Sequence, residues 1–309
     1  MQRMQSWHIS DKSLCESGVW MEAWIIYFRD RATYNQQYIE FYIGEGRKLG
    51  ISVRLILVEE LEFGVRDGDW FISLHGMEPH RPDFVVMRAI YPLLSKQLGY
   101  MGFRVFNNAF IAEICNDKAK TYQYLAKTGI RMVTTEFCLN KRLPDAMEGI
   151  TGPTVIKAVD GHGGSQVFLV GDASERGNTD DPSAVLSGIG SSDAVVQPLT
   201  GNRHQDLRVY VIGREIVAAV LRTAKDGFKS NFSLGGEVRL YDLSKQERAL
   251  VHLIMDQFDF GLVGIDFIIG DDGELIFNEI EDVAGARMLY QCSDINIVER
   301  YLNYIVSKL

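Results

Sequence analysis

One stretch near the end of the chain constrains the fold more than any other: VGIDFIIGDDGELIFNEIEDVAGARML at 263–289. Two runs within it, 263–269 and 274–281, are rich in Val, Ile and Phe and have the length of β-strands. Between them stands Asp272-Gly273, the pair that favours a two-residue type I′ turn. The stretch therefore predicts a β-hairpin that turns at this pair.

The turn fixes which side chains of the hairpin share a face. Counting outward from it pairs Ile268 with Phe277 and Asp266 with Glu279. Strand side chains alternate with period two and directly opposed residues share a face, so Asp266, Glu279 and Glu281 are predicted to point the same way. The other face is expected to enter a core through Val263, Ile265, Phe267, Ile269, Ile276 and Ile280.

Three carboxylates on one face of a hairpin have two interpretations. Adjacent like charges destabilise a sheet unless something neutralises them. Hard oxygen ligands gathered at close range suit Mg²⁺ that is bound together with substrate phosphates. An antiparallel hairpin with a solvated polar face would carry the same pattern. The hairpin alone does not decide between a metal site and such a face.

The composition is that of a soluble globular protein with two or three domains. The 309 residues are 46% hydrophobic and 24% charged, and the formal net charge of −9 argues against nucleic acid or an anionic membrane as the main partner. The four cysteines form no CxxC pair, which favours reduced, buried thiols over disulfides or a zinc site. No apolar run reaches the ~18 residues of a membrane helix, and the N-terminus has no signal-peptide core, so a cytoplasmic protein is expected.

Strands and helices alternate in the first third of the chain. Short apolar strands are predicted at 23–28, 52–58, 84–88 and 104–107, with helices at 34–49 and 92–99. This alternation predicts parallel pairing and a doubly wound α/β unit to about residue 110. Ligands of such sheets bind beyond the carboxyl ends of the strands. Arg88 stands at such an end and is a candidate substrate contact; the alternative is a surface arginine.

A glycine-rich hairpin follows a helix that is predicted at 108–129. Strands at 153–159 and 166–170 flank DGHGGS, a tip at 160–165 whose backbone N–H groups could close over anionic oxygens. The tip is not a P-loop, because no Lys-Ser/Thr follows it, and a strand rather than a dinucleotide-binding helix comes next. A flexible hairpin tip is the alternative. Lys157 lies in an apolar strand, where an unpaired charge is costly, so an anion is expected nearby.

The last part of the chain adds strands that carry arginines. A polar surface loop is predicted at 176–183 and a strand at 194–199. A hairpin is predicted over 206–212 and 216–222, with Arg208 and Arg222 in its strands. A loop at 228–236 and an amphipathic helix at 244–258 precede the carboxylate hairpin, and a helix at 295–308 closes the chain.

The order of these pieces resembles a known family. A lysine before a helix, a strand lysine, a glycine-rich hairpin, VVQPL, DLR, AAVLR, FKSNFSLGG, GIDF and NEIE occur in sequence. This run, over roughly 84–290, is similar to the ATP-grasp ligases, most of all the RimK-type amino-acid ligases, which are related to glutathione synthetase and D-alanine:D-alanine ligase. The resemblance implies a mixed α/β and α+β fold in three parts. They are an N-terminal doubly wound parallel-sheet domain (1–110), a central glycine-loop domain (111–193) and a C-terminal antiparallel-sheet domain (194–309).

The resemblance also implies roles for single residues. The nucleotide would be held by Lys118, Lys157, the tip Asp160, Gly161, His162, Gly163, Gly164 and Ser165, and the backbone of Gln197 and Leu199 around adenine. Magnesium would be bound by Asp266, Glu279 and Glu281. The transferred phosphate and the substrate carboxylate would be held by Arg208, Arg222 and Asn231, and Lys229 joins Arg88 as a candidate substrate contact.

Two departures from the family pattern concern the substrate. The third metal position is usually asparagine, and here it is Glu281, whose extra charge would strengthen magnesium binding or face a cationic substrate. The usual Ser-Pro-Gly sequence after it is replaced by DVAGARM, and the resemblance assigns no role to Arg287.

The implied activity is an ATP-dependent carboxylate–amine ligase. An acylphosphate would form and an amine would attack it, releasing ADP and phosphate, with ATP and Mg²⁺ (or Mn²⁺) as cofactors and an amino acid or peptide as substrate. Two alternatives are a catalytically silent nucleotide-binding regulatory protein and a ligase with a thiol or carrier-protein acceptor. The sequence leaves open the carboxylate, the amine and the oligomeric state, a homo-oligomer included.

Overall fold

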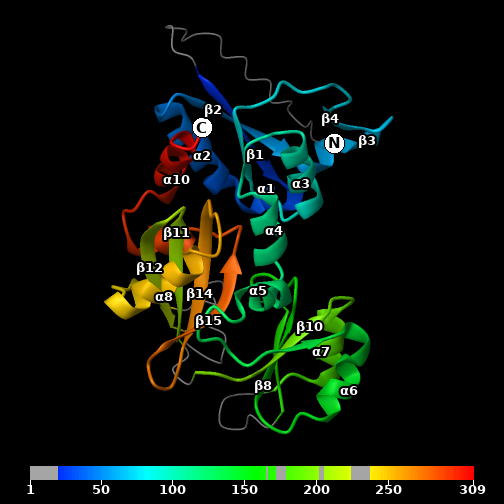
Figure 1. Ribbon diagram of the computed structural model, residues 1–309, viewed down its shortest axis with the longest axis vertical. Coiled ribbons are helices and arrows are strands. Elements are labelled where there is room, and N and C mark those ends of the chain that lie inside the picture. Colours follow the sequence, from blue (N-terminus) through cyan, green and yellow to red (C-terminus); the bar gives the residue numbers. More distant parts are fainter. Residues whose placement is uncertain (1–19, 165, 172–178, 202–204, 224–236) are drawn as a thin grey trace, which may run out of the picture.

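The structure is a computed structural model that describes residues 20–164, 166–171, 179–201, 205–223 and 237–309. The predicted site residues Ser165, Asn231 and Lys229 lie outside this part of the chain. Three sheets follow one another along the long axis of the molecule, with the parallel N-terminal sheet at one end and the central sheet at the other (Figure 1).

The N-terminal sheet is parallel and buried on both faces, as the sequence predicts. Its strand order is β2-β1-β5-β6, formed by β1 (Met21–Tyr27), β2 (Ile51–Leu57), β5 (Phe84–Met87) and β6 (Val105–Phe106). Alternate residues of β1 enter two separate cores, Ile25 on one face and Ile26 on the other. Helices α1 (Arg29–Tyr34), α2 (Gln36–Lys48) and α3 (Pro92–Tyr100) accompany the sheet. The helix predicted at 34–49 is α2, and α1, which ends just before it, was not predicted.

An antiparallel hairpin in this region was not predicted. It consists of β3 (Leu61–Arg66), which follows a short 3₁₀ helix at Val58–Glu60, and β4 (Asp69–Leu74). Its turn is Asp67-Gly68, both with positive φ, the same residue pair that predicts the C-terminal hairpin. The Gln97 amide on α3 donates to the carbonyls of Gly64 and Phe71 and holds the hairpin against the helix.

The helix predicted at 108–129 is divided into two helices, α4 (Ala109–Cys115) and α5 (Lys118–Leu125). The break lies at Asn116-Asp117 because both side chains bond to the backbone. Asn116 donates to the Ala112 carbonyl, while the Asp117 carboxylate accepts from the Lys120 N–H and caps α5. The break makes Lys118 the first residue of a new helix.

The central sheet is antiparallel, in the order β7-β10-β8-β9. Its strands are β7 (Glu136–Cys138), β8 (Thr154–Ala158), β9 (Val167–Val170) and β10 (Ala194–Pro198). Helices α6 (Leu143–Glu148), which follows a 3₁₀ turn at Asn140–Arg142, and α7 (Pro182–Ile189) share a core with one face. The predicted surface loop at 176–183 therefore ends in a helix, which Asp181 caps. The domain boundaries stay a prediction. Strand β10, which the predicted boundary assigns to the C-terminal domain, hydrogen-bonds within this central sheet.

The C-terminal sheet is antiparallel, in the order β13-β12-β11-β14-β15. Its strands are β11 (Gln205–Ile212), β12 (Glu215–Thr223), β13 (Glu237–Leu240), β14 (Leu262–Ile269) and β15 (Leu275–Glu281). The apolar face packs on α8 (Lys245–Met255), which begins with a Ser244–Glu247 capping box. Helices α9 (Arg287–Cys292) and α10 (Ile297–Val306) follow. Tyr301 and Leu302 of α10 share one core with Tyr42 of α2, which joins this part to the N-terminal sheet.

The β14–β15 hairpin forms, but part of its predicted register is wrong. The chain turns over 270–274, with a Gly273 N–H to Gly270 carbonyl bond, so Phe277 pairs with Phe267 and not with Ile268. A bulge that leaves Asn278 as an extra residue then restores the predicted pairing of Asp266 with Glu279.

The change of register alters which residues of β15 enter the core. Leu275 and Phe277 enter the core, and Ile276 lies on the opposite face, contrary to the prediction. The sequence did not reveal this change of register, because the longer turn shifts the pairing by one residue and the bulge shifts it back. Asp266 therefore pairs with Glu279 whether the two features are present or not.

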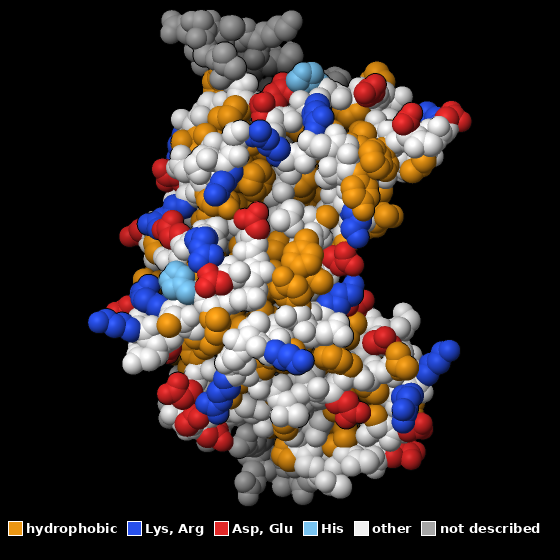
Figure 2. All heavy atoms as spheres, in the orientation of Figure 1, with side chains coloured by type: hydrophobic (Ala, Val, Ile, Leu, Met, Phe, Trp, Pro, Cys, Tyr) orange, Lys and Arg blue, Asp and Glu red, His pale blue; other side chains and the backbone are white. Residues whose placement is uncertain are grey.

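The surface seen in Figure 2 carries acidic and basic side chains interspersed with one another. Such mixing agrees with a modest negative net charge rather than with an extended basic surface on this face. Within the described part of the chain, none of the helices has the length and apolar character needed to cross a bilayer.

The register can be tested through Phe277, which is fully buried between the rings of Tyr122 and Phe267. We expect Phe277→Ala to lower the free energy of unfolding by about 3–5 kcal/mol, because it leaves a cavity in a close-packed core. Phe137→Ala, on β7 and 49% exposed, is the matched control and should change it by less than about 1 kcal/mol. Urea unfolding followed by circular dichroism measures both, and equal losses would contradict the register.

Candidate functional site

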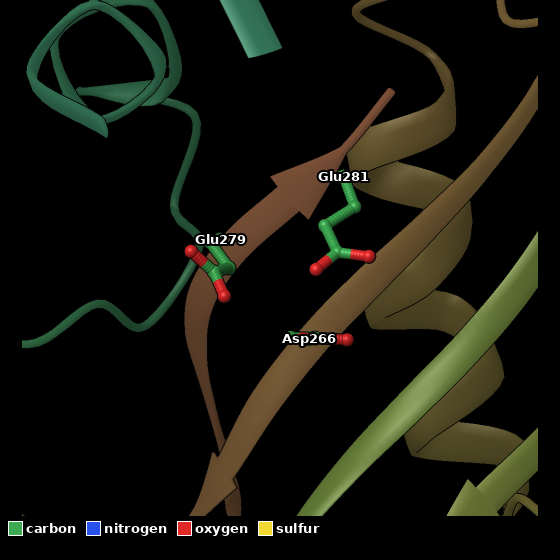
Figure 3. A group of neighbouring side chains, drawn as sticks. All are labelled: Asp266, Glu279 and Glu281. Atoms are coloured by element: carbon green, nitrogen blue, oxygen red, sulfur yellow. The ribbon is translucent and has the colours of Figure 1, made fainter. Parts of the chain in front are cut away.

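The polar face of the C-terminal sheet carries a cluster of three carboxylates. Asp266 on β14 and Glu279 and Glu281 on β15 place carboxylate oxygens within 4.8 Å of one another. Figure 3 shows the Glu281 side chain reaching from its strand toward Asp266. The structure thus brings together the three residues that the sequence predicts as a metal site.

Asp266 is the buried centre of this cluster, at 1% exposure. Its Oδ1 and Oδ2 accept two parallel bonds from Arg208, at 2.7 and 2.6 Å, and Oδ2 also accepts from Arg222 at 2.9 Å. Burial raises the pKa of Asp266, but the two guanidiniums outweigh burial and hold that pKa at about 2. The carboxylate is therefore charged at every physiological pH.

The two arginines extend this cluster into a chain of alternating charges. Arg208 Nη1 reaches Glu281 at 2.6 Å, and Arg222 makes a two-bond pair with Asp206. Asp206 was not predicted as a site residue. Its signal was the DLR motif, since Asp206 pairs with Arg222 across the β11–β12 hairpin and shares its face. The chain Asp206–Arg222–Asp266–Arg208–Glu281 balances charge that would otherwise be buried alone.

The donor set fits a magnesium ion. Carboxylate oxygens are the ligands that Mg²⁺ takes in small number beside substrate phosphates and water. Glu279 and Glu281 keep 28% and 27% of their side-chain surface exposed, and the ion pairs with Lys118 and Arg208 engage one oxygen of each, so the other oxygen is available. Asp266 accepts three bonds from arginines and retains about one acceptor site on Oδ1. The two glutamates thus offer most of the free oxygen lone pairs.

Two lysines face this cluster from the central part of the chain. Lys118 Nζ donates to the Gly161 carbonyl and lies 3.5 Å from a Glu279 oxygen. Lys157 Nζ donates to Asn278 Oδ1 at 2.8 Å, an acceptor that the β15 bulge supplies. Burial lowers the pKa of Lys157 to about 8; nearby Glu279 raises it and Lys118 lowers it. A cation that burial disfavours is well placed to receive an anionic ligand.

The glycine-rich tip lies beside the lysines. Asp160 accepts a bond from the Ser192 hydroxyl at 2.5 Å, which anchors the start of the tip. Gly163 and Gly164 have φ of 68° and 76°, a region in which side chains other than glycine are strained. His162, next to them, is exposed.

The two predicted adenine contacts lie at the end of β10. The buried Gln197 amide donates to the Thr135 hydroxyl at 2.8 Å, and the Leu199 N–H donates to the Pro153 carbonyl at 2.9 Å. A nucleotide at this strand would therefore use other backbone groups or displace the Leu199 bond. The adenine role of this strand stays a prediction.

A cavity of about 600 Å³ adjoins the cluster. Its walls come from the carboxyl ends of β1 and β5, the glycine-rich tip and the segment after β15, with Glu281, Arg208 and Arg222 at the cluster end. Arg88 lines it and is 6% exposed, so it is not the surface arginine of the alternative interpretation. Arg88 donates from Nε to the Tyr27 hydroxyl at 3.3 Å and from Nη2 to the Ala284 carbonyl at 2.9 Å.

A buried polar group that was not predicted ties the cavity walls together. The Asp282 carboxylate accepts from the amides of Asn107 and Asn116, which precede and follow α4. Asn107 also accepts from the Gly261 N–H and donates to the Leu262 carbonyl. Burial raises the pKa of Asp282. The only sequence signal was a second acidic residue directly after Glu281.

Comparison with known proteins gives consistent matches. Residues 115–305 match the model of the RimK-like ATP-grasp domain. The chain is 27% identical to "Uncharacterized protein MG011" of Mycoplasma genitalium over 91% of this chain and 90% of that protein. It is 30% identical to a "Probable alpha-L-glutamate ligase" of Legionella pneumophila over 67% and 68%. The ATP-grasp ligase PsnB, solved with minimal precursor, Mg and ADP, has the same fold, with a TM-score of 0.63 at 15% identity over 92% of this chain and 96% of that one.

The charge network predicts a large loss of stability when its central carboxylate is neutralised. Asp266→Asn leaves two buried guanidiniums without their shared counter-charge, so we expect the free energy of unfolding to fall by about 3–5 kcal/mol. Asp272→Asn is the matched control, because its 2.6 Å pair with Arg131 is half exposed and should contribute no more than about 1 kcal/mol. Urea unfolding in the presence of a metal chelator measures both variants. A loss no larger for Asp266→Asn than for the control would refute the central place of this pair.

Proposed function

The chain belongs to the RimK-like ATP-grasp family, and on that premise we propose that it is an ADP-forming ligase that joins a carboxylate to an amine. One observation carries the proposal: three carboxylates, two lysines and a glycine-rich tip converge beside a cavity lined by arginines. Ligases of this kind use ATP and Mg²⁺, and each group in that convergence suits one part of such a complex.

Nucleotide binding would fall to the cationic side of the site. Lys118 and Lys157 would contact the phosphates, with backbone N–H groups of 160–164 closing over them. Glu279, Glu281 and the remaining acceptor of Asp266 would hold Mg²⁺, or Mn²⁺ in its place. The ion, when bound, would neutralise phosphate charge and orient the transferred group. The predicted contributions of Ser165, Lys229 and Asn231 remain predictions.

The reaction would proceed in two transfers. A substrate carboxylate oxygen attacks the γ-phosphorus of ATP, the bond to the β-phosphate oxygen breaks, and ADP leaves. The amine nitrogen then attacks the carbonyl carbon of the acylphosphate, phosphate leaves, and the nitrogen loses a proton as the amide forms. Arg208 and Arg222 line the cavity and would stabilise charge on the transferred phosphoryl group, as fixed guanidiniums do best in a site closed to water.

The substrate would be an amino acid or a peptide. The name of the Legionella relative points to an amino acid, and the precursor peptide bound in another PsnB complex points to a peptide, as partners of such ligases. Arg88, in the cavity wall, is the proposed substrate contact. Retention of the carboxylates and arginines supports turnover over a silent nucleotide-binding role. A cytoplasmic location stays a prediction.

Turnover can be tested on the Glu279 carboxylate. With ATP, Mg²⁺ and a pool of amino acids, we expect ADP release that requires the amino acids, with an amide product visible by mass spectrometry. Glu279→Gln should lower kcat/KM by about a hundredfold or more, because an open oxygen ligand is lost. Glu274→Gln, an exposed glutamate of the same hairpin, should leave it unchanged. ATP hydrolysis that is indifferent to amino acids, or an active Glu279→Gln, would refute the proposal.

The depressed pKa of Lys157 predicts how ATP affinity depends on pH. The ammonium form prevails below a pKa of about 8 and is lost above it, so ATP binding should weaken from about pH 7 to about pH 9. Lys157→Met should bind ATP about tenfold more weakly at neutral pH, with a flatter pH profile over that range. Lys141→Met, an exposed lysine, is the control. Calorimetric titration with ATP measures all three, and an unchanged profile in Lys157→Met would remove Lys157 from the nucleotide site.

A further inference from the structure

Arg88 is a buried cation that forms no ion pair with any described residue. The carboxylate whose charge acts on it, Asp282, is hydrogen-bonded to Asn107 and Asn116. The bonds of Arg88 go to neutral groups: the Tyr27 hydroxyl and the carbonyls of Val283 and Ala284. These bonds engage Nε and Nη2, while Nη1 has no hydrogen bond to any described residue. Burial of a charge without a counter-charge is expensive. Because Arg88 lines the cavity, a ligand can supply the missing charge.

Arg287 stands in the wall of the same cavity and is in a similar position. Its guanidinium lies over the Tyr34 ring at 4.1 Å and donates to the Tyr34 hydroxyl at 2.6 Å. It also donates to the Tyr34 carbonyl and to Asn35 Oδ1, both at 3.3 Å. These contacts hold the guanidinium in place, and among the described residues no carboxylate pairs with it. It is exposed, at the mouth of the cavity.

The two acidic side chains of the cavity wall already have partners in the protein. Glu281 pairs with Arg208, and Asp160 accepts from Ser192. Arg88 and Arg287 have no carboxylate partner among the described residues, and Arg31 of the same wall lies 3.7 Å from Asp30. The wall therefore carries more guanidiniums than carboxylates, in a chain whose net charge is −9. A local excess of positive charge in an acidic protein attracts an anion to that place.

The wall of the cavity also carries apolar and aromatic side chains. They are Tyr27, Phe28, Tyr34, Tyr38, Ile90 and Met288. Such a wall accepts a hydrocarbon segment, while a charged segment there would lose its hydration without compensation.

We propose that this cavity takes a dicarboxylate with a hydrocarbon spacer, and that Arg88 and Arg287 are the specificity-determining residues for the carboxylate that ligation does not consume. The inference rests on the proposed function in one respect, because the carboxylate of the ligand that reacts would lie at Arg208, Arg222 and Glu281. Nη1 of Arg88 and the N–H groups that Arg287 does not use for Tyr34 and Asn35 would donate to the carboxylate that does not react.

The test compares two acids of equal length, glutarate and pentanoate, which differ by one carboxylate. Calorimetric titrations use the full chain with Mg²⁺ and a non-hydrolysable ATP analogue. We expect the wild-type protein to bind glutarate about tenfold or more tightly than pentanoate. Arg287→Gln should weaken glutarate binding about fivefold, as for an exposed ion pair, and leave pentanoate unchanged. Arg54→Gln, an exposed arginine of β2 outside the cavity wall, should change neither.

Arg88 needs a milder variant because its bonds to the carbonyls of Val283 and Ala284 also support the fold. Arg88→Lys keeps the charge but loses the Nη1 donor that Tyr27 and Ala284 hold in place, and we expect glutarate affinity to fall about tenfold while pentanoate affinity stays within about twofold. Its melting temperature serves as the check on folding. Arg287→Gln carries the test if this variant unfolds, since its side chain is exposed.

The outcomes separate this inference from the ligase proposal. Equal affinity for the two acids, binding of neither, or a glutarate preference that is undiminished in Arg287→Gln would overturn the anion site. None of these measurements requires turnover. Absence of amino-acid-dependent ADP release would therefore overturn the ligase proposal and leave the binding result standing.

Discussion

The pairing of one buried carboxylate with two guanidiniums is the interaction on which the rest of the structure depends. Asp266 lies on β14, Arg208 on β11 and Arg222 on β12, three neighbouring strands of one sheet. A slip of one residue in any of them would turn a charge into the core against α8. A buried ion pair adds little net stability but is costly to break, so we infer that this one mainly fixes the register of the sheet.

The same strand alternation serves the fold and the site. One face of the C-terminal sheet packs against α8, and the other presents the carboxylates to Lys118 and Lys157. The bulge at Asn278 brings an amide oxygen to Lys157, while Phe277 stays in the core. Charge balance within this face allows like charges to lie close together, as the proposed binding of phosphate oxygens and a divalent cation would require.

The cavity depends on how firmly its two walls are joined. Asp282 binds Asn107 and Asn116 across the junction, and α10 shares a core with α2. The carboxyl ends of β1 and β5 therefore face the segment after β15 at a fixed distance. The cavity lies where two sheets meet. The parallel N-terminal sheet contributes the carboxyl ends of its strands, where ligands of such sheets bind, and the antiparallel C-terminal sheet contributes its polar face.

The elements whose causes are local could be predicted from the residues alone. Strand alternation and an Asp-Gly turn predicted Asp266, Glu279 and Glu281 on one face, which holds because the longer turn and the bulge compensate for each other, and the order of motifs identified the fold. Only the tertiary structure decided the bulge at Asn278, the pairing of Asp206 with Arg222, and the burial of Arg88 against 283–284. These features depend on contacts between residues far apart in the chain. Periodicity and turn chemistry report on neighbours along the chain, and they carry no information about which distant group meets a given charge.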